Sequence, residues 1–76
     1  MLKHIIEYTV KSLVEFPDQV SITSTMQDSK ELFEIRVSTQ DIGKVIGKDG
    51  QTIRAVRMLL YSLIPQGQEI EITVAK

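Results

Sequence analysis

The sequence predicts a small α+β domain in which three helices cover one face of a three-stranded sheet. Three observations predict this class: 76 residues suffice for a single core, some segments place apolar residues at helical spacing, and three others alternate apolar with polar residues. The chain is 42% hydrophobic and 25% charged, which is ordinary for a folded protein. We therefore expect one domain over residues 1–76, in the order helix, strand, strand, helix, helix, strand.

The first helix is expected from Leu2 to Phe16, because apolar residues there follow one helical stripe while lysines and glutamates alternate at four-residue steps on the other side. Pro17 ends this helix, since proline has no amide hydrogen to donate. The charges within the segment argue against a signal peptide or a membrane anchor, so a cytoplasmic location is the default expectation.

Two strands should follow as a hairpin. Residues 20–26 alternate in polarity, residues 27–30 form a short polar connection, and Phe33, Ile35 and Val37 alternate with charged residues. A last strand is expected where Ile70, Ile72 and Val74 alternate with polar residues. These three strands supply the sheet.

Two helices are expected between the hairpin and the last strand. The first is short, includes Ile42, Val45 and Ile46, ends at Gly47, and has Ser38 or Thr39 as a candidate cap. The second opens near Gln51 and ends before Pro65 and Gly67. Its apolar stripe consists of Ile53, Val56, Leu60, Leu63 and Ile64, with Arg54 and Arg57 on a different face.

The segment between these two helices is the most informative part of the chain. Gly47 and Gly50 lack side chains, so the backbone there can bend tightly and approach a bulky partner. Amides at the start of the following helix would face an anion, which the helix dipole favours, and Lys48 adds a cation. The pattern predicts a loop that holds a phosphate chain.

Charge is distributed unevenly around this loop. The whole chain has a net charge of −1, but residues 36–57 contain five basic and two acidic residues, a net +3, which leaves −4 for the remainder. A local positive segment can attract a polyanion without making the whole protein basic. A solvated helix face is the ordinary alternative for such a cluster.

An enzyme, a metal site and a cofactor site are not expected. The chain has no cysteine and a single histidine, His4, which lies in the first turn of a surface helix without an evident partner. Glu69 and Glu71 have the spacing of a solvated strand face, and Gly47-Lys48 lacks the rest of a nucleotide-binding P-loop. A binding module is therefore favoured over a catalyst.

The run Val45-Ile46-Gly47-Lys48-Asp49-Gly50-Gln51-Thr52-Ile53 resembles the Ile-Gly-x-x-Gly-x-x-Ile hallmark of the KH domain. The order of elements resembles the type II, or prokaryotic, topology of that family over the whole chain. The chain is most similar to the small stand-alone bacterial KH proteins of the KhpA type. The resemblance implies a clamp on about four nucleotides of single-stranded RNA, and a role as an RNA chaperone or post-transcriptional regulator.

Carried onto this chain, the resemblance implies that Gly47, Lys48, Asp49 and Gly50 contact phosphate and sugar. The implied apolar wall for the bases consists of Ile42, Val45, Ile46 and Ile53, closed on the other side by Ile35 or Val37 of the second strand. For Ile46 and Ile53, core packing is an equal alternative. The positioning charges would be Lys44, Arg54 and Arg57, each of which could also be an ordinary surface charge.

Asp49 cancels Lys48 in the loop, and the chain has few aromatic residues for stacking, so we expect weak binding by a single domain. A homodimer, or a pair with another KH-containing RNA-binding protein, would raise avidity. Met58, Leu59 and Tyr61 are the candidate contacts, with packing on the sheet as the alternative. A KH-fold adaptor that binds protein rather than nucleic acid is the alternative function. The residues alone do not choose RNA over DNA.

Overall fold

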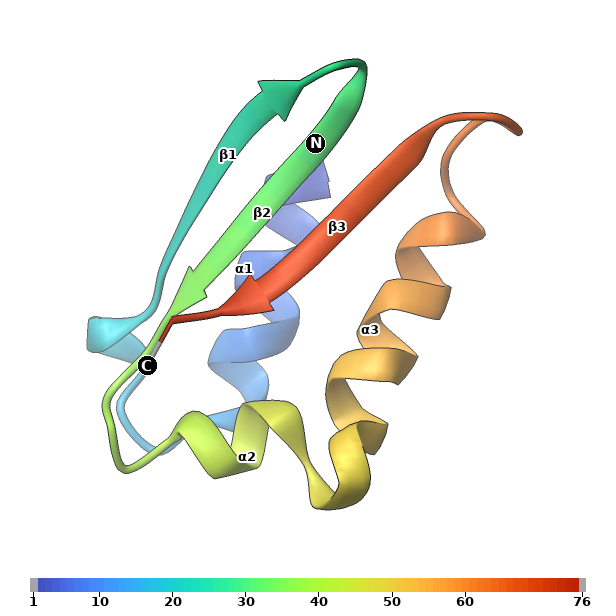
Figure 1. The fold of residues 1–76 in the computed structure, drawn as a ribbon. Coiled ribbons are helices and arrows are strands. Elements are labelled where there is room, and N and C mark those ends of the chain that lie inside the picture. Colours follow the sequence, from blue (N-terminus) through green and yellow to red (C-terminus); the bar gives the residue numbers. More distant parts are fainter. Residues whose placement is uncertain (1, 76) are drawn as a thin grey trace.

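The computed structural model describes residues 2–75 and has the expected order of elements (Figure 1). Its main elements are α1 (Leu2–Leu13), β1 (Ser21–Gln27), β2 (Lys30–Arg36), α2 (Ile42–Ile46), α3 (Gln51–Tyr61) and β3 (Glu69–Val74). Single 3₁₀ turns at Pro17–Gln19 and Lys48–Gly50 precede β1 and α3. The predicted α+β class and three-stranded sheet are confirmed.

The sheet is mixed, with strand order β1-β2-β3. β1 and β2 form an antiparallel hairpin in which Ile22 faces Ile35, whereas β2 and β3 run parallel, with Phe33 beside Ile72. Asp28 and Ser29 close the hairpin with φ values of 51° and 68°, as a two-residue turn with both central residues at positive φ does. Because β3 has one neighbour in this order, its other side is an edge of the sheet.

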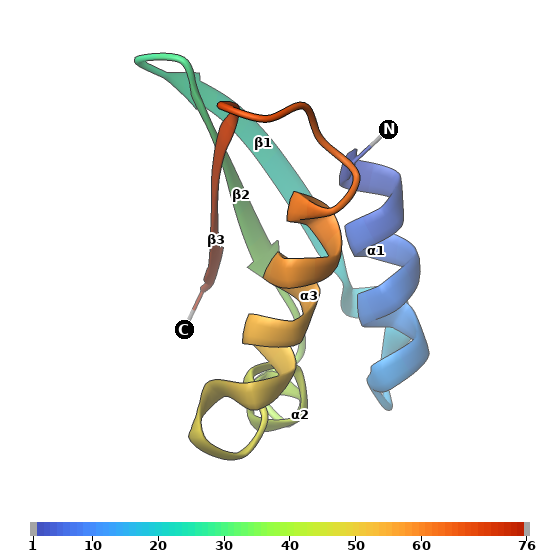
Figure 2. The same cartoon turned by 90° about the vertical axis from the view of Figure 1, so that its right-hand side faces the viewer.

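The helices lie on one side of the sheet, as expected (Figure 2). α1 packs behind the β1 side of the sheet, α3 packs beside β3, and α2 lies at the end of the sheet where β2 and β3 finish. The buried core between the layers consists of Ile6, Val10, Val20, Ile22, Phe33, Ile35, Val45, Val56, Leu60, Ile70 and Ile72. Burial of these side chains is the main stabilising term for so small a domain.

The elements differ from the predictions mainly at their ends. α1 ends at Leu13 rather than Phe16, because the amides of the next residues bond to a distant carboxylate instead of continuing the helix. α3 ends at Tyr61, four residues before Pro65, so Leu63 lies beyond it and is 54% exposed rather than in the core. The second half of β1 extends beyond the helices, which leaves Ser24 and Met26 exposed.

Candidate nucleic-acid interface

The glycine segment forms a tight bend between α2 and α3. α2 ends at Gly47, with φ 78° and ψ 168°, and α3 begins after Gly50, with φ 74° and ψ 17°. Asp49, between them, also has a positive φ of 57°. Three of four consecutive residues thus adopt angles that L-residues seldom take, which fixes a sharp reversal between two helices.

The two glycines are required for different reasons. A Cβ at Gly47 would lie 2.7 Å from the Cβ and 2.8 Å from the amide nitrogen of Thr52, and it would also overlap the Thr52 hydroxyl. A Cβ at Gly50 would meet only the Arg54 guanidinium, at 3.7 Å, which is ordinary contact. Gly47 therefore lets the bend close against the first turn of α3, whereas Gly50 supplies only a left-handed conformation. No local pattern of residues indicated that Thr52 contacts Gly47.

The bend leaves two backbone donors without a hydrogen-bond partner in residues 2–75. Its own hydrogen bonds use the amides of Gly47, Gly50 and Gln51, which donate to the carbonyls of Gly43, Gly47 and Lys48. Within residues 2–75 the amides of Lys48 and Asp49 make no hydrogen bond, and both residues are exposed. The Arg54 guanidinium donates to the Asp49 carbonyl at 2.8 Å, which braces the tip of the bend against α3. Two adjacent amides therefore remain free to bond an anion, in the turn that precedes the N-cap of α3.

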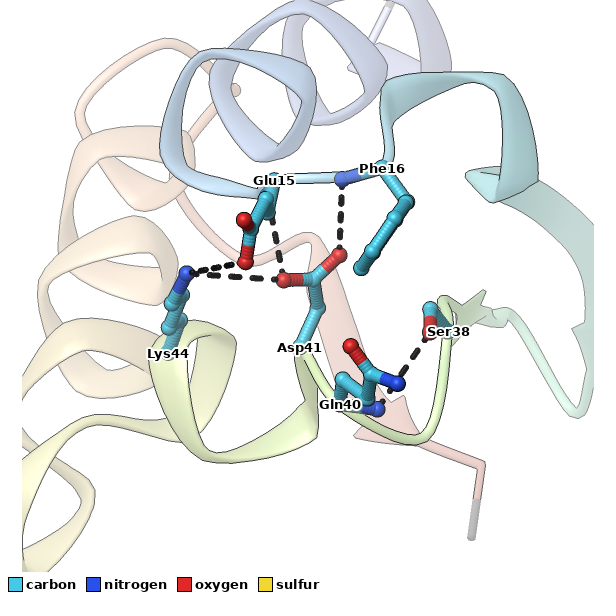
Figure 3. Close-up of polar contacts among 6 residues, drawn as sticks. All are labelled: Glu15, Phe16, Ser38, Gln40, Asp41 and Lys44. Atoms are coloured by element: carbon cyan, nitrogen blue, oxygen red, sulfur yellow. Dashed lines mark hydrogen bonds and ion pairs between the residues drawn. The ribbon is translucent and has the colours of Figure 1, made fainter.

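A buried carboxylate fixes the other end of α2 (Figure 3). Asp41 is fully buried, and its two carboxylate oxygens accept the backbone N–H groups of Glu15 and Phe16, each at 3.0 Å. Asp41 rather than Ser38 or Thr39 occupies the N-cap position of α2, although its side chain makes no cap bond. The bonds run instead to the segment after α1, so they join two parts of the chain 25 residues apart. From the sequence alone, Asp41 is expected only to contribute one of the two negative charges in residues 36–57.

The same cluster determines where Lys44 lies. Its ammonium is 3.4 Å from the Glu15 carboxylate and 3.8 Å from that of Asp41, on the α1 side of α2. Ile46, two residues later, points about 160° away on a helix of 3.6 residues per turn. Lys44 and Ile46, both predicted to meet one strand of nucleic acid, therefore lie on opposite sides of α2. Lys44 is engaged with acidic neighbours rather than free at the bend.

A stripe of candidate side chains follows α3. Arg54, Arg57 and Tyr61 fall within about 60° of one another around the helix, and this sector continues to Gly50. The hydroxyl of Tyr61 reaches β3, since it donates to the carbonyl of Ile70 at 3.0 Å and accepts its amide at 3.4 Å. The stripe therefore faces the edge of β3. Both arginines are exposed, which agrees with the prediction that they leave the apolar face.

The edge of β3 carries outward-pointing backbone groups. The amide of Ala75 donates to the carbonyl of Ile35 in β2 at 2.9 Å. Because backbone groups of successive strand residues point to opposite sides, those of Ile70, Ile72 and Val74 point away from β2. The Tyr61 hydroxyl bonds both backbone groups of Ile70, so the backbone groups of Ile72 and Val74 form the open part of the edge. We call the strip between the α3 stripe and this edge the α3–β3 seam.

The structure changes which residues can form the predicted apolar wall. Val45 is 1% exposed and Ile35 fully buried, so both belong to the core and neither reaches a ligand. Val37 and Ile53 are half-buried and pack against the core, while Ile46 is half-buried at the end of α2. The strand beside α3 is β3 rather than the second strand, because β2 is covered on both sides by its neighbours. Parallel pairing could not be read from the alternating pattern alone.

The three candidate dimer residues do not share one surface. Met58 is 68% exposed and Leu59 45% exposed. Leu59 points about 160° away from Tyr61, whose hydroxyl is bonded to β3. Met58 lies between them, about 60° from Tyr61 and about 100° from Leu59. Met58 and Leu59 thus expose apolar surface away from the core, whereas the Tyr61 hydroxyl lies at the seam.

A separate hollow of about 250 Å³ lies on the opposite face of the sheet. Its lining consists of Thr23, Thr25, Leu32, Phe33, Glu34, Glu71 and Thr73. None of its lining residues belongs to the glycine bend or to α3. None of the helices described is long and apolar enough to span a membrane.

Comparison with known proteins identifies the family. A family model described as KhpA/KhpB, KH domain, matches residues 3–75. The chain belongs to this KH-domain family. The resemblance carried by the glycine segment is thereby confirmed, as is the assignment of a single KH domain as the fold. The family is not enzymatic, in agreement with the expectation of a binding module.

Relatives of the KhpA type resemble the chain over most of its length. RNA-binding protein KhpA of Thermotoga maritima is 35% identical over 99% of this chain and 100% of its own. RNA-binding protein KhpA of Oceanobacillus iheyensis is 37% identical over 90% and 91%, respectively.

Among solved structures, a crystal structure of Era in complex with MgGDPNP and nucleotides 1506–1542 of 16S ribosomal RNA is similar, with a TM-score of 0.60. The identity is 19% over 97% of this chain and 30% of that one, so this likeness concerns the fold alone.

Proposed function

We propose that this protein binds single-stranded RNA, with the sugar-phosphate backbone at the glycine bend and the bases along the α3–β3 seam. The observation that carries the proposal is that the amides of Lys48 and Asp49, between two glycines and just before α3, make no hydrogen bond within residues 2–75. Such donors suit a phosphate oxygen. The names of the KhpA relatives, which are RNA-binding proteins, support RNA as the nucleic acid.

The remaining contacts follow from the geometry of the seam. Lys48 and Arg57 are exposed and place positive charge at the bend and about two turns further along α3, where it neutralises phosphates without reading sequence. Ile46 and Ile53 offer half-buried apolar surface to the bases. Lys44 contributes only to long-range attraction, because Glu15 and Asp41 already engage it. A KH glycine loop clamps about four nucleotides, which is the length of strand proposed here.

A protein with such a site would act as an RNA chaperone or post-transcriptional regulator in the cytoplasm. A protein that binds only unpaired RNA shifts the equilibrium away from pairing in proportion to its occupancy. Asp49 is exposed beside Lys48 and offsets its charge, so we expect a single domain to bind weakly. Pairing of two domains would then raise the affinity through effective concentration.

We propose that pairing, with a second copy or with another KH-containing protein, uses the outer side of α3, where Met58 and Leu59 expose apolar surface. Sedimentation equilibrium at high protein concentration should give a mass above the monomer, and Met58→Glu should restore the monomer. A monomeric mass for the unaltered protein at the highest concentration would remove self-pairing.

The RNA site itself is tested by Lys48→Asp, with binding measured by fluorescence anisotropy of a labelled single-stranded RNA at several salt concentrations. The substitution places two carboxylates in the bend, so affinity should fall at least about tenfold, and the salt slope should decrease by about 0.7 for the lost phosphate contact. Lys3→Asp is the matched control. It makes the same charge change in the first turn of α1, at the other end of the molecule (Figure 1).

Equal losses in the two variants would attribute binding to net charge and contradict a site at the bend. Unchanged RNA binding in Lys48→Asp would also contradict it. An absence of RNA binding by the unaltered protein would favour the protein-binding adaptor, whose partner should remain bound after the same substitution.

A further inference from the structure

Tyr61 links the end of α3 to the edge of β3. Its hydroxyl donates to the Ile70 carbonyl at 3.0 Å and accepts the Ile70 amide at 3.4 Å, so it pairs with both outward backbone groups of that residue. These bonds hold the phenol across the α3–β3 seam, while the residue stays 43% exposed. The ring therefore has a fixed position and accessible surface at the same time.

Its place along the seam is equally specific. Tyr61 is the eleventh residue after Gly50, a distance of roughly 16 Å along the helix at 1.5 Å per residue. β3 runs in the opposite direction, with Ile70 beside Tyr61 and Val74 toward α2 (Figure 1). The open backbone edge at Ile72 and Val74 thus lies between the glycine bend and the phenol. Tyr61 marks the far end of that stretch.

No other aromatic side chain occupies the seam in residues 2–75. Phe33 is buried in the core, Phe16 lies in the connection after α1, and Tyr8 is on α1, which packs on the β1 side of the sheet, whereas α3 packs beside β3 (Figure 1). An aromatic ring offers every base a face on which to stack. A ring at the end of a single-strand site is therefore positioned to meet the last base bound.

Building on the proposed function, we infer that Tyr61 terminates the RNA site: its ring stacks on the base farthest from the glycine bend and so sets the length of strand that is bound. A strand with stacked spacing of about 3.4 Å would place on the order of five nucleotides in roughly 16 Å, and fewer where bases are unstacked. The hydroxyl holds the ring in place through Ile70. Dinucleotides held at the bend would not reach it.

Tyrosine fluorescence tests this directly, because the chain has two tyrosines and no tryptophan. Tyr8→Phe leaves Tyr61 as the sole tyrosine, and titration with randomised RNA oligonucleotides should quench its emission by about half or more. Quenching should begin at about four nucleotides and be absent with dinucleotides. Tyr61→Phe, in which Tyr8 is the sole tyrosine, is the matched control for light absorption by RNA and should show no quenching.

Affinity measurements separate stacking from simple closure of the β3 edge. Tyr61→Leu should weaken binding of octanucleotides by roughly 5- to 150-fold, the range for loss of one stacked base, and leave dinucleotide binding unchanged. Tyr61→Phe keeps the ring without its two hydrogen bonds and should lie between Leu and the unaltered protein. A role confined to the hydroxyl predicts equal losses for Phe and Leu.

Constant Tyr61 emission at saturating RNA, with binding verified by anisotropy, would overturn the inference while leaving the proposed function intact. An octanucleotide affinity unchanged in Tyr61→Leu would do the same. Failure of the unaltered protein to bind any of the oligonucleotides would overturn both.

Discussion

Replacement of Gly47 by alanine should destabilise the fold far more than the same replacement at Gly50. At Gly47, φ 78° and ψ 168° lie in a region that only glycine enters readily, which costs about 1–3 kcal/mol for another residue. The added Cβ would also lie 2.7 Å from the Cβ of Thr52, and overpacking of this kind costs about 1–3 kcal/mol. The total is about 2–6 kcal/mol.

Gly50 provides the internal control. Its left-handed φ of 74° costs an alanine about 1–2 kcal/mol, and the added Cβ would have room beside Arg54 at 3.7 Å. Gly50→Asn should cost less still, since asparagine tolerates the left-handed region. The two glycines look alike in the sequence, so a large difference between them would come from tertiary contact alone.

Urea unfolding followed by circular dichroism would measure the difference. With the middle of each range, Gly47→Ala should cost at least about 2 kcal/mol more than Gly50→Ala, and a slope of about 1 kcal/mol per molar converts this to a midpoint about 2 M lower. Midpoints that agree within experimental error, or a lower midpoint for Gly50→Ala, would refute the steric argument built on Thr52.

Two further predictions concern groups that hold the bend in place. Asp41→Asn removes the charge that accepts two backbone N–H groups at 3.0 Å in a fully buried site, so the free energy of unfolding, measured with urea, should fall by about 3 kcal/mol. The control Asp18→Asn, on an exposed turn, should change the urea midpoint little. Equal stabilities of the two variants would contradict the role of Asp41. Arg54→Lys keeps the charge but loses the guanidinium bond to the Asp49 carbonyl, so RNA affinity measured by anisotropy should drop several-fold. The control Arg57→Lys should retain the affinity of the unaltered protein. Matching losses of affinity in the two variants would exclude a bracing role specific to Arg54.

Much of the fold could be predicted because its determinants are local. Helical spacing of apolar residues in α1 and α3, alternation in the strands and the two glycines each act within a few neighbouring residues. These patterns place the six main elements and the bend between α2 and α3. The family resemblance rests on the same local signals, since the glycine segment and its flanking isoleucines are contiguous.

The site was predicted only in part, because several of its features depend on partners distant in sequence. Alternation does not reveal strand direction, and the parallel pairing of β2 with β3 is what makes β3 the edge beside α3. Helical spacing gave no sign that Tyr61 reaches Ile70, or that Lys44 faces Glu15 rather than the bend. The burial of Asp41 likewise depends on amides 25 residues away or more.

The amino-acid sequence by itself determined the order of elements, the position of the bend and the family, since each follows from residue types at short spacing. The tertiary structure alone decided which strand borders α3, which cations face that border and which isoleucines and valines are buried. These properties are set by packing between layers and by strand pairing, and such long-range contacts leave no periodic mark in the chain.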